Sequence, residues 1–180
     1  TDSETFRKWQ KPSFLSLNFQ ISLPLASYPI GPSSRFKVSS GCMSVLEGAH
    51  FFSLYIGLGG RFSVTRTSVI VDNIRAENNV FDTWRIGGGA YFSCPLSTRW
   101  LAGSKLLVER VHYPDLQQTS YLVDSRHSFS LGTGLSLTFR AHQHYGIRLL
   151  LDYDLLPYRT AGRQICVHSL TLGTAFLVAF

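Results

Sequence analysis

The sequence predicts an all-β protein, a closed eight-stranded antiparallel up-and-down transmembrane β-barrel. Three observations support this prediction. Hydrophobic residues alternate with small or polar ones along most of the chain, as expected for strands whose two faces meet different surroundings. The connections between these segments alternate between long and short. Charged residues make up only 16% of the 180 residues, which is few for the exterior of a soluble barrel.

The length suits one domain. Residues 1–13 are polar and irregular, and we interpret them as a periplasmic tail or linker remnant; residues 14–180 form the predicted barrel. No apolar run approaches the roughly 18 residues of a membrane-spanning helix. Because the chain begins at Thr1 without a signal peptide, it resembles a mature or trimmed product. Three cysteines without metal spacing are expected to be free thiols, and no metal or cofactor is predicted.

Eight alternating segments are predicted to be strands. The first begins at Phe14, with Leu15 and Phe19 on one face and Asn18 and Gln20 on the other. The other seven are expected at 35–46, 51–64, 83–94, 100–112, 127–139, 144–156 and 168–180. Each is long enough for the roughly 9–11 residues of a tilted strand that crosses a bilayer.

The predicted connections fall into two classes. Short turns are expected at 47–50, 95–99 and 141–144. Long loops are expected at 24–34, 65–82, 113–126 and 157–162, with an alternative in which a strand extends through Ser68–Val71. Both termini then lie at the short-turn end, which is the rhythm of an up-and-down barrel. Closure would leave no strand edge unpaired, as a lipid environment requires.

The apolar face of these strands is expected to face lipid. In the last segment, Leu172 and Phe176 alternate with Thr171, Gly173 and Ala175. A soluble, lipocalin-like barrel would place its large apolar residues inside and its charges outside. The second face here consists mainly of Ser, Gly, Asn and Thr. Such small residues fit the narrow lumen of an eight-stranded barrel.

Aromatic residues gather in two bands, as the interfacial girdles of membrane barrels require. Those near the short turns are Phe14, Phe52, Trp100, Phe139, Tyr145 and Phe180. Those near the long loops are Phe36, Trp84, Phe129 and Tyr153.

Four segments carry a resemblance to a known family: YIGLGGRF (55–62), RIGGGAYF (85–92), SLGTGLSLTF (130–139) and SLTLGTAFLVAF (169–180). They resemble the glycine-aromatic strands of small eight-stranded outer-membrane β-barrels of Gram-negative bacteria, the outer membrane protein A/X-like class, and the loops resemble those of Bacteroidetes proteins. The resemblance implies a location in the bacterial outer membrane and contact with its lipid and lipopolysaccharide. It also implies that Phe176, Val178 and Phe180 act as an assembly signal for the barrel-assembly machinery.

Charged residues of both signs share the inward-facing positions. Arg61, Arg85, Glu109, Asp152 and Asp154 are expected in the long-loop half of the lumen, with Lys105 and Arg148 lower. Because unpaired buried charges are costly, these residues should form a salt-bridged network that plugs the lumen. The alternative is a gated ion path or a proton-sensitive switch.

The net charge of +6 suggests a second kind of site, because several arginines lie on or near the long-loop side. These are Arg66, Arg75, Arg126, Arg159 and Arg163. We expect them to contact phosphate or carboxylate groups of surface glycolipid.

Other motifs favour structural interpretations. No helix pattern follows the glycines at 57–60, so they are expected to be strand glycines and not a phosphate loop. His142 and His144 lack a third metal ligand and are expected in an exposed turn. His127, His112 and His168 have no serine partner on the same face, so no local triad is predicted, although one assembled from different strands stays open.

The predicted function is non-enzymatic: a structural or accessory subunit of a transport, secretion or assembly complex of the envelope. Other outer-membrane or periplasmic proteins would be its partners, with no role for nucleic acid. Cys42, Cys94 and Ala90 are small lipid-facing residues where a partner could pack. The alternatives are a small gated channel and a lipid-acting enzyme.

Overall fold

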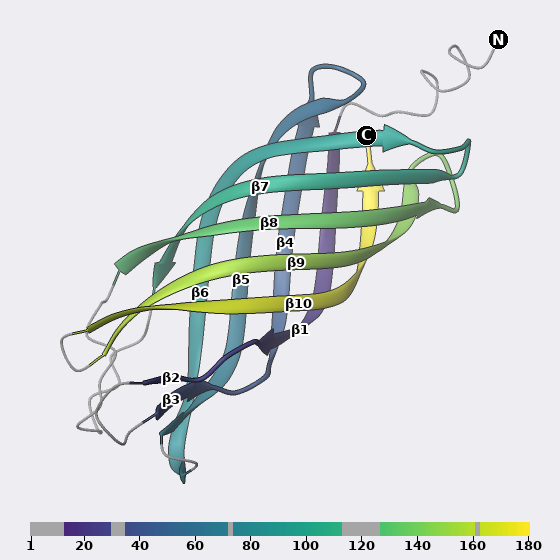
Figure 1. Ribbon diagram of the computed structural model, residues 1–180. Coiled ribbons are helices and arrows are strands. Elements are labelled where there is room, and N and C mark those ends of the chain that lie inside the picture. The colour runs from purple at the N-terminus through teal and green to yellow at the C-terminus, as the bar shows by residue number, and fades with distance from the viewer. Residues whose placement is uncertain (1–12, 30–34, 72–73, 113–126, 161–162) are drawn as a thin grey trace.

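The computed structural model describes residues 13–29, 35–71, 74–112, 127–160 and 163–180. Strands account for nearly all of these residues, and they wrap around a common axis into a barrel (Figure 1). Within the described ranges, no helix is long and apolar enough to cross a membrane. The described end of the first strand and the carboxyl terminus lie side by side, since the backbones of Ser13 and Phe180 exchange hydrogen bonds of 3.1 and 3.0 Å.

Eight long strands form the wall in the described part of the chain. They are β1 (Ser13–Pro24), β4 (Gly41–Phe51), β5 (Ile56–Val71), β6 (Ile74–Pro95), β7 (Trp100–His112), β8 (His127–Arg140), β9 (Tyr145–Thr160) and β10 (Arg163–Ala179). Each pairs antiparallel with its sequence neighbour in the wall, and β1 closes the circle against β10. Two short strands, β2 (Tyr28–Pro29) and β3 (Arg35–Val38), pair outside this circle. The predicted fold class is confirmed.

Alternation along each strand separates the two faces of the wall. On β1, Leu15 and Phe19 are 48% and 61% exposed, whereas Ser16 and Asn18 are almost completely buried. Inverted burial of this kind, with large apolar side chains outside and polar ones inside, is the arrangement of a barrel in lipid. The outer wall therefore supplies the apolar belt, and the lumen holds the polar groups.

The second predicted strand differs from the observed one in its continuity and in where it ends. Its segments β3 and β4 are separated at Ser39 and Ser40, so Val38 faces the lumen while Cys42 faces outward. The facing reverses because the register against β5 shifts by one residue between the two segments, with Val38 opposite Val69 but Cys42 opposite Arg66. The predicted turn at 47–50 is wrong: β4 continues to Phe51, and the turn lies at 52–55, so the next strand begins at Ile56 instead of 51.

The predicted long loop at 65–82 is also wrong, whereas the extension through Ser68–Val71 is correct. Strands β5 and β6 continue as a hairpin almost to its tip, with a register irregularity between Ser68 and Ile70. Strands β2 and β3 extend this hairpin sideways (Figure 1). We call β2, β3 and residues 66–71 and 74–82 the outer sheet. Similarly, the predicted loop at 157–162 is mostly strand, since β9 runs to Thr160 and β10 begins at Arg163.

Candidate functional site: the lumen charge network

Eight charged side chains fill the middle of the lumen, four cations and four anions, and none is more than 6% exposed. We call these residues the lumen network: Arg61, Arg85, Lys105, Arg148, Glu47, Glu109, Asp152 and Asp154. Their formal charges cancel. They come from five strands, β4, β5, β6, β7 and β9, so the network joins walls that are far apart in the sequence.

Arg61 lies at the centre of the network and contacts three carboxylates. Its guanidinium donates two hydrogen bonds to Glu109, at 2.8 and 2.5 Å, in a bidentate pair. It also reaches Asp152 at 3.1 Å and Asp154 at 2.9 Å. Arg85 lies on the long-loop side and contacts Asp154 at 3.0 Å. Paired, hydrogen-bonded charges of this kind are the form in which buried ions are tolerated.

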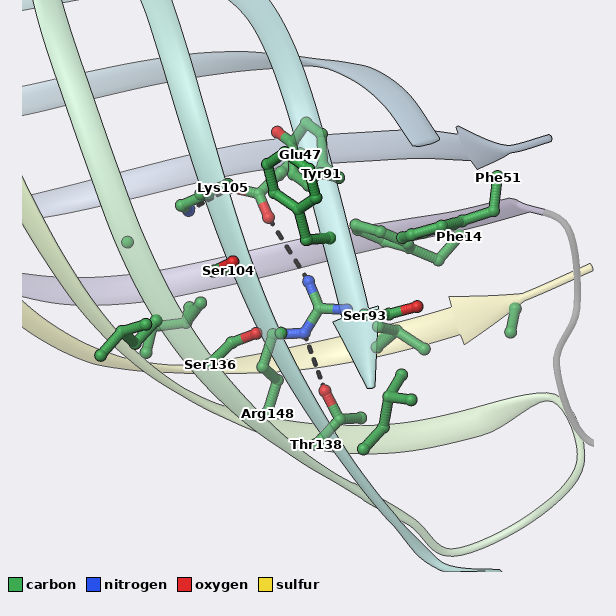
Figure 2. Close-up of a pocket in the computed structure, with 18 of the residues that line it drawn as sticks. Phe14, Glu47, Phe51, Tyr91, Ser93, Ser104, Lys105, Ser136, Thr138 and Arg148 are labelled. Atoms are coloured by element: carbon green, nitrogen blue, oxygen red, sulfur yellow. Dashed lines mark hydrogen bonds and ion pairs between the residues drawn. The ribbon is translucent and has the colours of Figure 1, made fainter. Parts of the chain in front are cut away.

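The short-turn half of the network is built around Glu47. Lys105 Nζ lies 2.6 Å from Glu47 and 3.0 Å from Asp152, so one ammonium joins the two halves. The guanidinium of Arg148 is 3.4 Å from Glu47, donates to Thr138 at 3.0 Å, and lies 4.3 Å from the ring centroid of Phe14. Figure 2 shows Arg148 between Glu47 and Thr138.

Two glycines on β8 make room for the carboxylates of β9. A Cβ at Gly132 would lie 2.7 Å from Asp154 Oδ1, and one at Gly134 would lie 2.8 Å from the Lys105 side chain. Side chains at these positions would displace the network, because atoms do not approach that closely. The two glycines of β8 therefore leave the space that the network side chains occupy.

A small cavity lies on each side of the network. The one toward the short turns has a volume of about 40 Å³ and includes Phe14, Tyr91 and Arg148 in its lining (Figure 2). The one toward the outer sheet has about 20 Å³ and is lined in part by Thr83 and Arg85. The network therefore separates two polar spaces, and it is the part of the described lumen that a solute would have to pass.

All seven predicted lumen charges point inward and contact one another within the network. The sequence-based prediction of the lumen charges omits Glu47, because it places a turn at 47–50. Its signal was present in the sequence: Met43, Val45, Glu47 and Ala49 alternate, and all four are buried. Following the alternation through Gly48 would have placed Glu47 in the lumen.

Most predicted girdle residues lie on the outer wall. Phe52, Trp84, Trp100, Phe129 and Tyr145 are exposed, and Phe139 and Tyr153 are half-buried. Trp100 and Phe139 contact each other at 5.0 Å between ring centroids, as do Trp84 and His112 at 4.7 Å.

Phe14 is the exception, and its predicted place in the girdle is wrong. Its side chain is only 8% exposed and points into the barrel beneath Arg148. The reason is parity, because Phe14 is one residue from the outward-facing Leu15. Its closeness to a short turn indicated its height along the barrel but not its face.

The three residues of the predicted assembly signal lie at the end of β10. Phe176 and Phe180 are 55% and 62% exposed, and Val178 is half-buried. The ring of Phe176 stacks on Tyr145 of the neighbouring strand at 5.9 Å. The signal residues therefore form part of the lipid-facing wall at the short-turn end.

Only one of the five predicted glycolipid arginines has a described side chain. Arg66 pairs with Asp82 at 2.9 Å on the exposed outer sheet. The hydrogen bond to Asp82, followed by its charge, raises the pKa of the Arg66 guanidinium. The backbones of Arg75, Arg159 and Arg163 lie on β6, β9 and β10 at the long-loop side. Arg126 lies outside the described residues.

The described residues show no cluster of three or more potential metal ligands. His142 and His144 lie near each other in the turn before β9, where His144 contacts the carbonyl of Ala179. His168 is hydrogen-bonded to Tyr153 rather than to a serine. The three cysteines are free and exposed.

No family model matches the sequence, and no curated protein sequence is similar to it. Solved structures nevertheless share the fold. Neisserial surface protein A matches with a TM-score of 0.66 and 14% identity, covering 94% of this chain and 97% of that chain. The outer membrane protein OprG from Pseudomonas aeruginosa matches with a TM-score of 0.68 and 10% identity, covering 95% and 98%. The outer membrane protein AlkL, solved in lipid bilayers, matches with a TM-score of 0.61 and 14% identity, covering 95% and 90%.

The chain is therefore a small transmembrane β-barrel with the fold of bacterial outer-membrane proteins. The apolar outer wall, the charged lumen and these neighbours agree on that class. The predicted location in the bacterial outer membrane agrees with the same neighbours.

Proposed function

We propose that this barrel is a non-conducting, non-enzymatic anchor that presents the outer sheet to partners as an accessory subunit of an envelope assembly. The observation that supports this role most directly is the lumen network. Four buried cations are matched by four buried anions whose ion pairs cross the lumen, which supports a barrel that does not conduct. The surfaces that could bind partners are then the outer wall, the rim and the outer sheet.

The outer sheet supplies a surface that a minimal barrel would lack. Strands β5 and β6 extend past the wall, and β3 adds to the edge of β5 through Phe36, Lys37 and Val38. Rigid, hydrogen-bonded strands hold a binding surface at a lower entropic cost than a loop of the same length. Other outer-membrane or periplasmic proteins would be its partners, and barrel-assembly machinery and lipopolysaccharide would contact the wall.

The test is the native size of the protein extracted from outer membranes in mild detergent. We expect the wild-type chain in a species much larger than one barrel in a micelle. The matched variant replaces residues 69–79 with Asn-Gly between Ser68 and Val80, which already face each other across the hairpin. Two-residue Asn-Gly loops suit such hairpins. This variant should insert normally but run as a single barrel, and a wild-type protein that also runs as a single barrel would contradict the proposal.

A gated channel is the second candidate, and one observation favours it. Lys105 Nζ contacts carboxylates of both halves of the network, and small cavities flank the network on each side. If a displacement of Lys105 opened the lumen, Lys105→Met would raise conductance in planar bilayers several-fold. We expect instead closed wild-type and variant barrels, since Arg61 still joins three carboxylates across the lumen.

A lipid-acting enzyme would need a nucleophile, a base and an acid close together. Purified barrel incubated with outer-membrane lipid should release no fatty acid. Lipid turnover that survives repeated purification would overturn the non-enzymatic part of the proposal.

A further inference from the structure

We propose that Arg110, on the lipid-facing wall of β7, binds a phosphate group of an outer-leaflet membrane lipid. Arg110 lies between Glu109 and Val111, which are both fully buried in the lumen, so its own side chain is exposed outside. Its partners across the neighbouring strands are Ile86 and Phe129, which are 52% and 71% exposed. The Arg110 guanidinium is therefore surrounded by apolar side chains of the lipid-facing wall.

The height of Arg110 places it at the boundary of the apolar belt. Trp100 belongs to the aromatic band at the short-turn end of the same strand, ten residues away. At ~3.3 Å per residue and a strand tilt of ~45°, this separation is about 23 Å, close to the ~25 Å height of the apolar band of such barrels. The ring pair of Trp84 and His112 lies one step further toward the outer sheet. Arg110 is therefore level with the headgroup region.

Charge pairing distinguishes Arg110 from Arg66 and from the lumen arginines. Arg66 is already paired with Asp82, and the lumen arginines are paired with carboxylates. In the part of the chain that the structure describes, Arg110 forms no ion pair. A charged side chain at the lipid boundary is favourable when it reaches an opposite charge at the headgroups, and a guanidinium binds phosphate through two parallel hydrogen bonds.

A lipid phosphate fits this position better than a soluble anion. The apolar neighbours Ile86, Phe129 and Val108 would contact the acyl chains of the lipid, whereas a soluble ion would gain nothing from them. The sequence-based glycolipid hypothesis does not include Arg110. The inference rests on the lipopolysaccharide contact of the proposed function and names one residue for it; its lipid-binding test can fail while the native-size test of the accessory role succeeds.

The test measures lipid binding to the folded barrel by native mass spectrometry in a maltoside detergent, which contains no phosphate. The probes are bis-phosphorylated lipid A, its dephosphorylated form and phosphatidylglycerol. We expect wild-type protein to prefer phosphorylated lipid A, and Arg110→Gln to weaken that binding about tenfold, the loss of one charge-assisted contact. Binding of the dephosphorylated form should not change. Arg110→Lys keeps the positive charge but not the planar guanidinium. Its affinity for phosphorylated lipid A should lie between those of the wild type and of Arg110→Gln.

The matched control is Arg99→Gln, which removes an exposed arginine at the short-turn end. It should bind phosphorylated lipid A like the wild type. A loss for phosphatidylglycerol as well as lipid A would identify the ligand as any lipid phosphate, and a loss for lipid A alone would identify glycolipid. Unchanged binding by Arg110→Gln, or an equal loss with Arg99→Gln, would overturn the proposal.

Discussion

At the scale of single residues, Arg61 contacts more carboxylates than any other residue that the structure describes. Its guanidinium contacts Glu109, Asp152 and Asp154, and all four side chains are nearly inaccessible. A buried pair adds little stability over an apolar replacement, but removing one partner leaves the others uncompensated. The effect of Arg61 on stability should therefore be measured by removing it.

We predict that Arg61→Gln lowers the free energy of unfolding by about 3–5 kcal/mol, because three buried carboxylates lose their common cation. Urea titration of the barrel folded into phospholipid vesicles would measure this loss. Arg66→Gln is the matched control, since it removes an arginine whose pair with Asp82 is exposed to solvent, and it should change little. Equal effects of the two substitutions would mean that the lumen network does not stabilise the barrel.

At the scale of elements, the two faces of β10 have different surroundings. Its inward residues Ala175, Leu177 and Ala179 are buried, whereas Phe176 and Phe180 are exposed to lipid. Phe180 follows the last residue of the strand, so its side chain contributes little to the packing of the folded barrel. Loss of this ring should therefore affect assembly more than stability.

We predict that Phe180→Ala reduces the amount of barrel inserted into the outer membrane severalfold, while the unfolding midpoint of the protein that does insert is unchanged. Quantitative detection of the folded form in isolated membranes, with urea unfolding of the purified barrel, would measure the two effects. Leu172→Ala is a suitable control, because it removes an exposed apolar side chain from the same face. If both variants insert equally well, Phe180 is not part of an assembly signal.

Gly134 gives a second prediction at the scale of elements. Gly134→Val would place side-chain atoms where Lys105 and Asp152 now lie, and we expect it to destabilise the barrel by about 1–3 kcal/mol, a cost typical of overpacking. Urea unfolding would measure this cost. Leu135→Val, at the adjacent outward-facing position, should have a much smaller effect because lipid can adapt to it. An unchanged midpoint for the Gly134 variant would show that the lumen has spare room.

At the scale of the whole molecule, the barrel has its apolar surface outside and its charges inside. A tryptophan placed at Leu135, in a chain whose own three tryptophans are replaced by phenylalanine, should be quenched most by lipids brominated deep in the acyl chain. A single tryptophan kept at Trp84 should be quenched most by bromine near the headgroup. Aqueous iodide that quenched the Leu135→Trp protein strongly would indicate a wall that faces water.

The sequence predicted the fold well because period-two alternation is a local property. It follows from the pleat of each strand, and on β1 the residues Leu15, Asn18, Phe19 and Gln20 have the faces that the alternation predicts. The wrong predictions concern residues near strand ends, where the local pattern does not show how the strand pairs with its neighbours. The sequence predicts a turn at 47–50, where Glu47 lies in a strand, and it predicts the height of Phe14 along the barrel but not its face.

The alternation along the chain was enough to predict the fold class: strands with one apolar face and one small, polar face, closed into a barrel in a membrane. Three features needed the folded chain: which charges meet, the sheet formed by residues 66–71 and 74–82, and the lack of an ion pair at Arg110 within the described chain. The reason is physical. Facing is set by neighbours in sequence, but pairing depends on strand register and barrel closure, which bring Arg61 to Asp154 across 93 positions.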